Sequence, residues 1–549
     1  MDNKFVIYGM GNVGTELYYF IKLFGGEVLF FADRNKNKVG TSIENTICVS
    51  YEELLRMDKN IPLVVAIYKS DDIERELQEN GFTNVTGWKE LRRDLIERKR
   101  RENIILDIEK IKNIKTKIEI ELKKYKVINN KNRIKKRKNE KSLKIVEINF
   151  ADLVGKRFNG YDLMKELNNR GHNVCQIVKY KTSFDDNVIE VNKNDIEDIK
   201  IGIREFENSV SNVWYPYGQQ LLNIQEVQEA DILHFHILHN GFISLLDYPE
   251  LMQDKCVIWT IHDPWILTGN CIYPLECEKW KTGCKDCDGY GDHRYEMINM
   301  NTHTMWNLKK QVLNSLNPHV IVSCSFMKKY ISESLITKHW NNIHTIPFGI
   351  DINTYKTKLE EKSYINKKNR ITIGFRAEDV EIKGCRYIYD ALNYLNLGEN
   401  ISVITVGSGF VPDSIKEKYT VIEKGWIDGE ELRNFYSEID LFIMPSLAET
   451  FGMMAIESMA AYTPVICFED TVLEEIIDAP NCGIAVKYKD FVGLAETINK
   501  ILTGEIEIES RAVFGRKLIE EKYSYDNYVN SHEELYKKIV SEYKGELFE

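Results

Sequence analysis

The chain has 549 residues, of which 43% are hydrophobic, and a net charge of −11 at pH 7. This length exceeds what one hydrophobic core covers, so we expect several domains. The chain contains no run of about 18 uncharged apolar residues, and residues 1–5 lack the basic and apolar blocks of a signal peptide. The sequence therefore predicts a cytoplasmic protein and argues against the membrane-spanning and secreted classes.

Residues 1–95 predict a small Rossmann-like module. A strand over residues 4–8 leads into a glycine-rich turn and a helix, and a second apolar strand ends at an acid about 20 residues past the glycines. In the dinucleotide-binding fingerprint, the glycines admit a pyrophosphate and the acid binds a ribose hydroxyl. Two interpretations stay open: the module binds a nucleotide or dinucleotide, or the glycines only let the helix pack tightly on its strand. The residues concerned are Gly9, Gly11, Gly14 and Asp33.

Residues 96–141 form a separate, basic segment. Within it, residues 99–141 hold 17 Lys and Arg against 6 Asp and Glu, so the rest of the chain carries a net charge of −22. Apolar residues three and four positions apart predict an amphipathic helix over 104–125, although Lys115 interrupts the apolar stripe. This helix either forms a homodimer through a coiled coil, packs on a neighbouring domain or lies on an anionic membrane. Residues 131–141 predict a linker, with peripheral contact to lipid head groups or to an anionic acceptor as the alternative.

Strands and helices alternate after residue 144, which predicts parallel sheets covered by helices on both faces. A break near residues 347–349 divides this part into two domains, 142–346 and 347–549, with a ligand cleft between them. The predicted strands cover residues 144–150, 173–180, 231–236, 256–261 and 319–323 before the break, and 371–375, 401–406, 421–423, 440–444 and 465–468 after it.

The loop after residues 440–444 carries the most specific pattern in the chain. Glu449 and Glu457 lie eight residues apart, about 12 Å if the segment is mostly helical. Paired glycosidase carboxylates are roughly 5–9.5 Å apart, so these acids suit two separate sugars of an extended ligand, such as the hexose and ribose of a nucleotide sugar. For a bare pair of acids, a solvated helix face is the simpler interpretation. With Pro-Ser before them and Phe451 and Gly452 between them, however, they resemble the signature of retaining glycosyltransferases with the GT-B fold.

This resemblance, to glycosyltransferases of the family-four type, covers roughly residues 144–525. It implies an α/β fold in which two Rossmann-like domains flank a central cleft, here preceded by the small Rossmann-like domain and a helical linker. It also implies that the last helices, over 510–546, cross back and brace the two lobes.

Several residues of the second half match positions that bind the donor in this family. Arg376 and Lys383 lie at and just beyond the carboxyl end of a predicted strand, where two fixed cations suit a diphosphate and stabilise its growing charge as the glycosyl bond breaks. The resemblance assigns them this role; surface cations are the alternative. Gly407 and Gly409 form a turn that we expect to line the nucleotide pocket. Trp426 lies where related enzymes contact the base, or is a packing residue.

On the N-terminal side of the cleft, the resemblance places a glycine-rich loop near the phosphates and the acceptor, here between Gly155 and Gly160. Unlike the shorter glycine pair often found in the family, this loop carries Lys and Arg between its glycines. His262 follows a predicted strand and is the candidate for binding the donor sugar near its reacting carbon. A structural histidine paired with Asp263 is the alternative.

The stretch from His262 to Cys287 resembles a subgroup of bacterial glycosyltransferases that build exopolysaccharides and related surface glycans. Its cysteines follow the spacing C-x5-C-x6-C-x2-C, and in a reducing cytoplasm such a cluster indicates structural zinc more than disulfides. Four free thiols are the alternative, and no catalytic metal is expected. The candidate zinc ligands are Cys271, Cys277, Cys284 and Cys287.

The resemblance implies a retaining hexosyltransferase that moves a sugar from a nucleotide sugar to a hydroxyl of a glycan, lipid-linked or protein acceptor in bacterial surface-glycan synthesis. Glu449 then binds donor-sugar hydroxyls and Glu457 binds ribose, while the leaving diphosphate itself deprotonates the acceptor. The alternative is a sugar-nucleotide-binding scaffold, dimerised through the basic helix and without transfer activity. Nucleic acid is not an expected partner, and contact with the inner face of the membrane would be peripheral.

Overall fold

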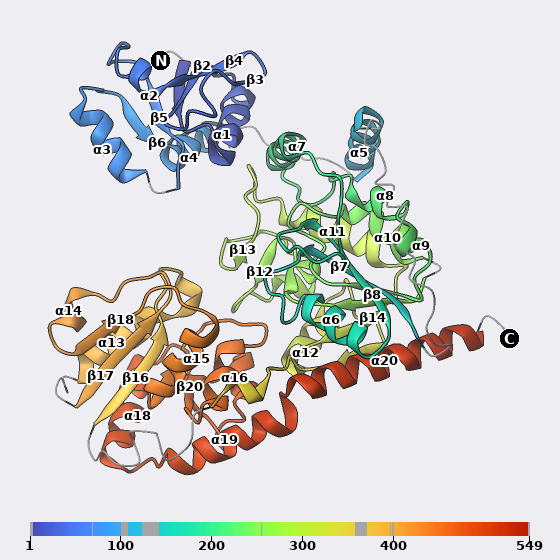
Figure 1. Ribbon diagram of the computed structural model, residues 1–549, viewed down its shortest axis with the longest axis vertical. Coiled ribbons are helices and arrows are strands. Elements are labelled where there is room, and N and C mark those ends of the chain that lie inside the picture. Colours follow the sequence, from blue (N-terminus) through green and yellow to red (C-terminus); the bar gives the residue numbers. More distant parts are fainter. Residues whose placement is uncertain are drawn as a thin grey trace.

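The computed structural model describes residues 4–68, 70–99, 108–122, 142–253, 255–356, 370–395, 397 and 400–546. These residues form three α/β units in chain order. Figure 1 shows the first unit in blue, the second in green and the third in orange. A long C-terminal helix, α20 (Tyr525–Glu546), runs from the third unit along the second.

The first unit is a six-stranded sheet with the order β3-β4-β2-β1-β5-β6, parallel except for the β3–β4 pair. Its central strand β1 buries Val6 and Ile7 completely, because apolar clusters cover both faces of the sheet. The elements are β1 (Lys4–Tyr8), α1 (Asn12–Leu23), β2 (Glu27–Asp33), β3 (Ser42–Ile43), β4 (Thr46–Ser50), α2 (Tyr51–Leu54), β5 (Leu63–Val65), α3 (Asp71–Glu79), β6 (Val85–Gly87) and α4 (Trp88–Lys99).

The basic segment contributes one described helix, α5 (Ile108–Leu122), which packs on the second unit. Ile111 is fully buried, and its carbonyl oxygen accepts a hydrogen bond from the indole of Trp214 at 3.0 Å. Lys115, which interrupts the apolar stripe in the sequence, is buried in an ion pair with Asp247. Of the three predicted roles, these contacts favour packing on a neighbouring domain. The predicted linker over 131–141 lies outside the described residues, as do both ends of the predicted helix.

The second unit is an all-parallel sheet with the order β15-β14-β11-β10-β7-β8-β9. Its inner strands are buried on both faces. The main elements are β7 (Lys144–Ala151), α6 (Tyr161–Asn169), β8 (Asn173–Tyr180), β9 (Val188–Glu190), α7 (Asp195–Glu207), α8 (Tyr217–Leu221), α9 (Gln225–Gln228), β10 (Ile232–Phe235), α10 (Tyr248–Met252), β11 (Val257–Thr260), the hairpin β12 (Cys271–Tyr273) and β13 (Asp292–His293), α11 (Thr302–Leu313), β14 (His319–Val322), α12 (Ser325–Glu333) and β15 (Ile343–Thr345).

The third unit repeats this architecture with the parallel order β18-β17-β16-β19-β20-β21. Within the described residues, no helix has the length and apolar character needed to span a bilayer. The elements before α20 are β16 (Ile371–Arg376), α13 (Cys385–Leu395), β17 (Ile401–Val406), α14 (Asp413–Lys416), β18 (Thr420–Glu423), α15 (Gly429–Glu438), β19 (Leu441–Ile443), α16 (Met453–Ala460), β20 (Val465–Phe468), α17 (Val472–Ile476), β21 (Ile484–Val486), α18 (Phe491–Thr503) and α19 (Glu509–Lys522).

All ten strands predicted for the two large units are confirmed, with ends that differ by at most a residue or two. The unpredicted strands of these units are the hairpin strands β12 and β13 and the strands β9, β15 and β21, which have three residues each and lie at the edges of the two large sheets. Such short segments carry too little apolar pattern to be recognised in the sequence.

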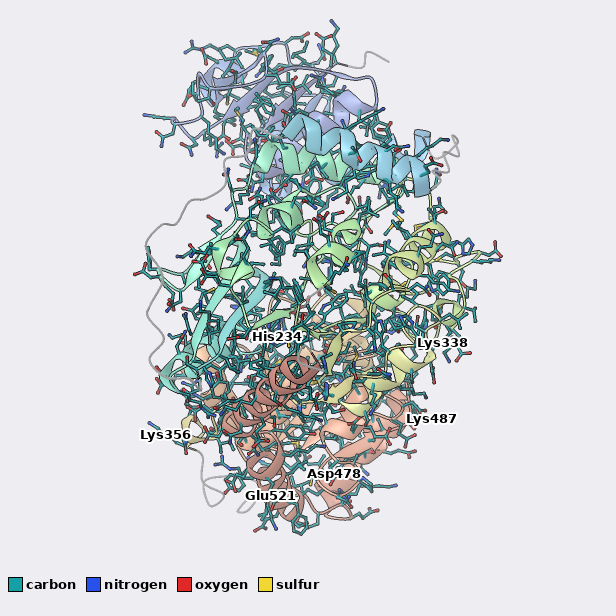
Figure 2. All side chains as sticks on the ribbon, turned by 90° about the vertical axis from the view of Figure 1, so that its right-hand side faces the viewer. His234, Lys338, Lys356, Asp478, Lys487 and Glu521 are labelled. Atoms are coloured by element: carbon teal, nitrogen blue, oxygen red, sulfur yellow. The ribbon has the colours of Figure 1, made fainter. Side chains whose placement is uncertain are left out.

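The prediction that the last helices brace the two large units is also confirmed. Helix α19 packs on α16 of the third unit, and α20 contacts the second unit, where Arg170 donates a hydrogen bond to Glu533 at 2.8 Å. The hydroxyl of Tyr536 lies 2.6 Å from Nδ1 of the fully buried His234. Figure 2 shows His234 inside the molecule next to α20, whereas Lys487 and Glu521 lie at its outside.

Candidate active site

A cavity of about 320 Å³ lies between the second and third units. Its walls include His262 from the second unit and Arg376, Lys383 and Glu449 from the third. These four residues follow or end the parallel strands β11, β16 and β19, and the carboxyl ends of parallel strands are where α/β proteins bind ligands. The structure thus brings the four predicted catalytic residues, distant in the sequence, to one cavity.

Glu449 and Lys383 form the charged centre of this cavity. The Lys383 ammonium lies 2.7 Å from Oε1 of Glu449, and the Ser446 hydroxyl donates to the same oxygen at 3.0 Å. The loop reaches helix α16 through Gly452, whose φ of +101° is accessible to few other residues. A Cβ on Gly452 would also lie 2.3 Å from Leu473, so the sharp entry into the helix requires glycine.

Arg376 ends β16 and is oriented by two neighbours. Its Nε donates to Glu378 at 2.7 Å, and its guanidinium carbon lies 5.1 Å from the ring centre of Trp426, a cation–π contact. The indole of Trp426 is 68% exposed, so it is not a core residue. Gly407 and Gly409 pack on the turn just after Arg376, where a Cβ on either would lie 2.5–2.7 Å from backbone atoms. These two glycines therefore support the Arg376 turn from outside the cavity wall.

Glu457 is not on the wall of the cavity. Its side chain is buried, accepts a hydrogen bond from the Tyr436 hydroxyl at 2.9 Å and forms an ion pair with Arg157. Arg157 belongs to the loop between Gly155 and Gly160, so this ion pair joins the two units. The residues predicted for the site include the two glycines of that loop but not Arg157, although a cation between two glycines is a signal visible in the sequence.

His262 lines the cavity, and its ring contacts two aromatic rings. Its ring stacks on Phe348 with centres 5.8 Å apart and contacts Phe158 at 5.7 Å. Burial lowers the pKa of His262 well below its ordinary value, so the imidazole is neutral at pH 7. The alternative pairing with Asp263 is wrong: Asp263 bonds to His239 at 2.9 Å, and the partner of His262 is His236, at 3.0 Å.

The four cysteines of the predicted zinc site lie around the β12–β13 hairpin. Cys271 and Cys284 are buried, and Cys277 and Cys287 are half-buried. The Cys287 sulfur lies 3.4 Å from Nε2 of His293, which pairs with Cys271 across the hairpin. Among the described residues, however, no three of these cysteines have their sulfur atoms all within 4.8 Å of one another. Structural zinc therefore stays a prediction.

In the first unit, the glycine-rich turn makes packing contacts that account for its glycines without a ligand. Gly9 has a φ of +99°, and a Cβ on Gly14 would lie 1.8 Å from the Gly9 carbonyl oxygen, so both glycines serve the packing of α1 on β1. The Asp33 carboxylate accepts a hydrogen bond from the Met10 N–H at 2.8 Å and lies 3.3 Å from Lys38. These contacts favour the packing interpretation, and a nucleotide in this module stays a prediction.

Comparisons with known proteins agree with this geometry. The family described as "Glycosyltransferase Family 4" matches residues 161–354, and "Glycosyl transferases group 1" matches residues 356–520. The chain belongs to these GT-B glycosyltransferases, which are retaining enzymes that use nucleotide-sugar donors. Residues 1–160, including the first unit, lie outside both matches.

The individual relatives resemble this chain at low sequence identity. A putative colanic acid biosynthesis glycosyl transferase of Escherichia coli is 22% identical over 55% of this chain and 76% of its own length. A capsular polysaccharide biosynthesis glycosyltransferase of Staphylococcus aureus is 27% identical over 41% of this chain and 60% of its own. Among solved structures, sucrose-phosphate synthase from Thermosynechococcus elongatus matches with a TM-score of 0.51 at 17% identity. The match covers 72% of this chain and 99% of the synthase chain. WaaG, a glycosyltransferase involved in lipopolysaccharide biosynthesis, gives a TM-score of 0.50 at 14% identity, covering 71% of this chain and 99% of that one. The structural likenesses establish the fold.

Proposed function

We propose that this enzyme transfers a hexosyl group from a nucleotide sugar to a hydroxyl of a glycan, lipid-linked or protein acceptor, as a cytoplasmic step of bacterial surface-glycan synthesis. The observation that carries the proposal is the convergence of Glu449, Lys383, Arg376 and His262 on one cavity between two Rossmann-like units. The names of the relatives in colanic acid and capsule synthesis support the surface-glycan assignment.

In the proposed reaction, the bond between the anomeric carbon and the diphosphate oxygen breaks, and the acceptor oxygen bonds to that carbon on the same face of the sugar. The proton of the acceptor hydroxyl passes to the departing diphosphate. Arg376 and Lys383 stabilise the charge that grows on the diphosphate, a contribution strongest in the transition state. Glu449 binds donor-sugar hydroxyls, and His262 orients the sugar near its anomeric carbon.

The proposed ribose-binding residue, Glu457, already has a cationic partner. A ribose hydroxyl that donates a hydrogen bond to Glu457 would either share this carboxylate with Arg157 or displace Arg157 from it. A displaced Arg157 would be free to approach the diphosphate. On this account, donor binding is coupled to the contact between the two units through the loop that carries Gly155 and Gly160.

A panel of UDP-, GDP- and other nucleotide sugars tests the function. Wild-type protein should release nucleotide from one donor and transfer its sugar, whereas a scaffold would bind the donor and release none. Glu449→Gln should reduce turnover sharply while keeping the wild-type unfolding midpoint. Glu417→Gln, which changes an exposed acid of the same unit, is the control and should keep full activity. Unchanged turnover in Glu449→Gln would refute the role given to Glu449.

A further inference from the structure

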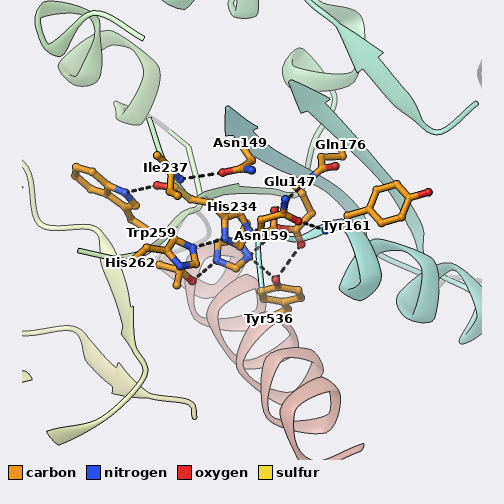
Figure 3. A network of polar contacts seen from close by, with 12 residues as sticks. Glu147, Asn149, Asn159, Tyr161, Gln176, His234, Ile237, Trp259, His262 and Tyr536 are labelled. Atoms are coloured by element: carbon orange, nitrogen blue, oxygen red, sulfur yellow. Dashed lines mark hydrogen bonds and ion pairs between the residues drawn. The ribbon is translucent and has the colours of Figure 1, made fainter. Parts of the chain in front are cut away.

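A chain of buried polar contacts connects the C-terminal helix α20 to His262 (Figure 3). The Tyr536 hydroxyl of α20 donates to Oε1 of Glu147 at 3.2 Å. The second carboxylate oxygen of Glu147 lies 2.7 Å from Nε2 of His236, whose Nδ1 lies 3.0 Å from Nε2 of His262. Only the last member of this chain lines the cavity.

Strand register explains how these side chains meet. Glu147 on β7 pairs with His234 on the neighbouring parallel strand β10, so both side chains project from the same face of the sheet. His236 follows two residues later and shares that face. Gly160 leaves the necessary space, because a Cβ there would lie 2.8 Å from both Glu147 Oε2 and His236 Nε2. The face is then closed by α20.

Burial and charge decide where the protons lie. The side chains of Glu147 and His236 are fully buried, and burial lowers the pKa of His236 to about 4. Burial alone would raise the pKa of Glu147, but its contacts with His234 and His236 outweigh this and hold the pKa below its ordinary range. At pH 7, Glu147 is therefore an anion that only accepts hydrogen bonds, and His236 is neutral with one proton.

These charge states fix the direction of every hydrogen bond from Tyr536 to His262. His236 must carry its proton on Nε2 to donate to Glu147, so its Nδ1 is an acceptor. His262 must then donate from Nε2, and because it is neutral its Nδ1 carries no proton. Within the described part of the chain, Nδ1 of His262 has no hydrogen-bond partner, so this acceptor is available to a ligand in the cavity.

We propose that Glu147 and His236 are positioning residues that hold His262 in the Nε2-protonated tautomer, so that its Nδ1 accepts a hydrogen bond from a hydroxyl of the donor sugar. The role of the sugar rests on the proposed function. Tyr536 extends the chain to α20, so the helix that braces the two units also supports the orientation of His262.

A metal ion is the competing explanation for this cluster, because ligand atoms of Glu147, His234 and His236 all lie within 4.8 Å of one another. The geometry favours hydrogen bonds. Tetrahedral zinc with bonds of about 2.0–2.1 Å keeps its ligand atoms roughly 3.3 Å apart. Here Oε2 of Glu147 lies 2.7 Å from His236 and 3.0 Å from Nδ1 of His234, and Nδ1 of His234 also contacts the Tyr536 hydroxyl.

The test compares two substitutions at one position. In His236→Gln, the side-chain amide keeps the pattern, because its N–H can donate to Glu147 and its oxygen can accept from His262. In His236→Leu, both bonds are lost at similar volume. His319→Leu, which changes a histidine on β14 of the same sheet but outside the chain of contacts, is the control.

Transfer kinetics of the full-length variants should separate positioning from a merely structural role. We expect His236→Leu to lower kcat/KM for the donor about tenfold, His236→Gln to stay within about threefold of wild type, and His319→Leu to match wild type. Among mono-deoxy analogues of the donor, one should show a penalty in wild type and in His236→Gln that disappears in His236→Leu. Equal losses in both His236 variants, or a deoxy penalty that persists in His236→Leu, would overturn the proposal.

A measurement independent of activity keeps this test distinct from that of the proposed function. Histidine-selective 15N labelling of the folded protein should show His262 protonated on Nε2 in wild type and in His236→Gln, and a mixture of tautomers in His236→Leu. Protonation of His262 on Nδ1 in wild type would refute the proposal even if transfer is observed. One bound metal ion per chain at the cluster, lost in His236→Leu, would refute it as well.

Discussion

The buried histidines predict a loss of stability in mild acid, which His236→Gln should reduce. Burial lowers the pKa of His236 from 6.5 to about 4, so protonation is easier in the unfolded chain than in the folded one. A group with a lowered folded-state pKa contributes stability that is fully present above the unfolded pKa, near 6.5, and is lost as the pH falls toward 4. From these two values, protonation of His236 alone should lower the free energy of unfolding by about 2 kcal/mol at pH 5 and by about 3 kcal/mol at pH 4.

Urea unfolding at pH 7.5 and pH 5 measures this effect, with the fluorescence of the buried Trp214, Trp259 and Trp265 reporting on the second unit. Carboxylates elsewhere also titrate in this range, so the observable is the difference between variants. The stability of His236→Gln should fall about 2 kcal/mol less than that of wild type between the two pH values. His339→Gln, which replaces an exposed histidine, should behave as wild type does. Parallel losses in His236→Gln and wild type would refute the assignment of a neutral, buried His236.

The remaining predictions concern the cavity, the contact between units and the cysteines. Lys383→Met should lower kcat roughly 100-fold without moving the unfolding midpoint, because it removes one cation from the leaving diphosphate; an unchanged kcat at saturating donor would contradict that role. Gly160→Ala should destabilise the protein by about 2 kcal/mol or more, because φ is +92° and the Cβ would meet the buried carboxylate beneath it; a wild-type urea midpoint would show the space to be adequate. Arg157→Gln should speed hydrogen exchange in α16 by leaving the buried Glu457 without its cation; unchanged exchange would mean that the ion pair does not hold the units together. Cys287→Ser should lower the zinc content measured by mass spectrometry; wild-type protein that contains no bound zinc after purification would contradict the zinc prediction.

The alternation of strands and helices in the two large units could be predicted from the sequence. Strands such as β19 and β20 are continuous apolar runs, and the loop after β19 carries Glu449. The cluster of Glu449, Arg376 and Lys383 was also predictable, because each residue follows a recognisable strand and the carboxyl ends of parallel strands meet at one edge of a sheet.

The relations between side chains from distant segments were not predictable from one sequence. Glu147 and His236 lie in or beside buried strands, and a polar residue in such a strand has no visible partner until the register is known. Arg157 was passed over because its partner, Glu457, lies 300 residues away. Lys115 interrupts an apolar stripe, and nothing in the neighbouring sequence indicates its buried ion pair with Asp247 of the second unit.

The central claim is that the cavity between the second and third units binds the nucleotide sugar. A crystal structure with the donor selected by the panel tests it most directly. We predict the diphosphate within hydrogen-bond distance of Arg376 and Lys383, and the sugar within reach of Glu449 and Nδ1 of His262. A donor bound instead at the glycine-rich turn of the first unit, with this cavity empty, would contradict the account.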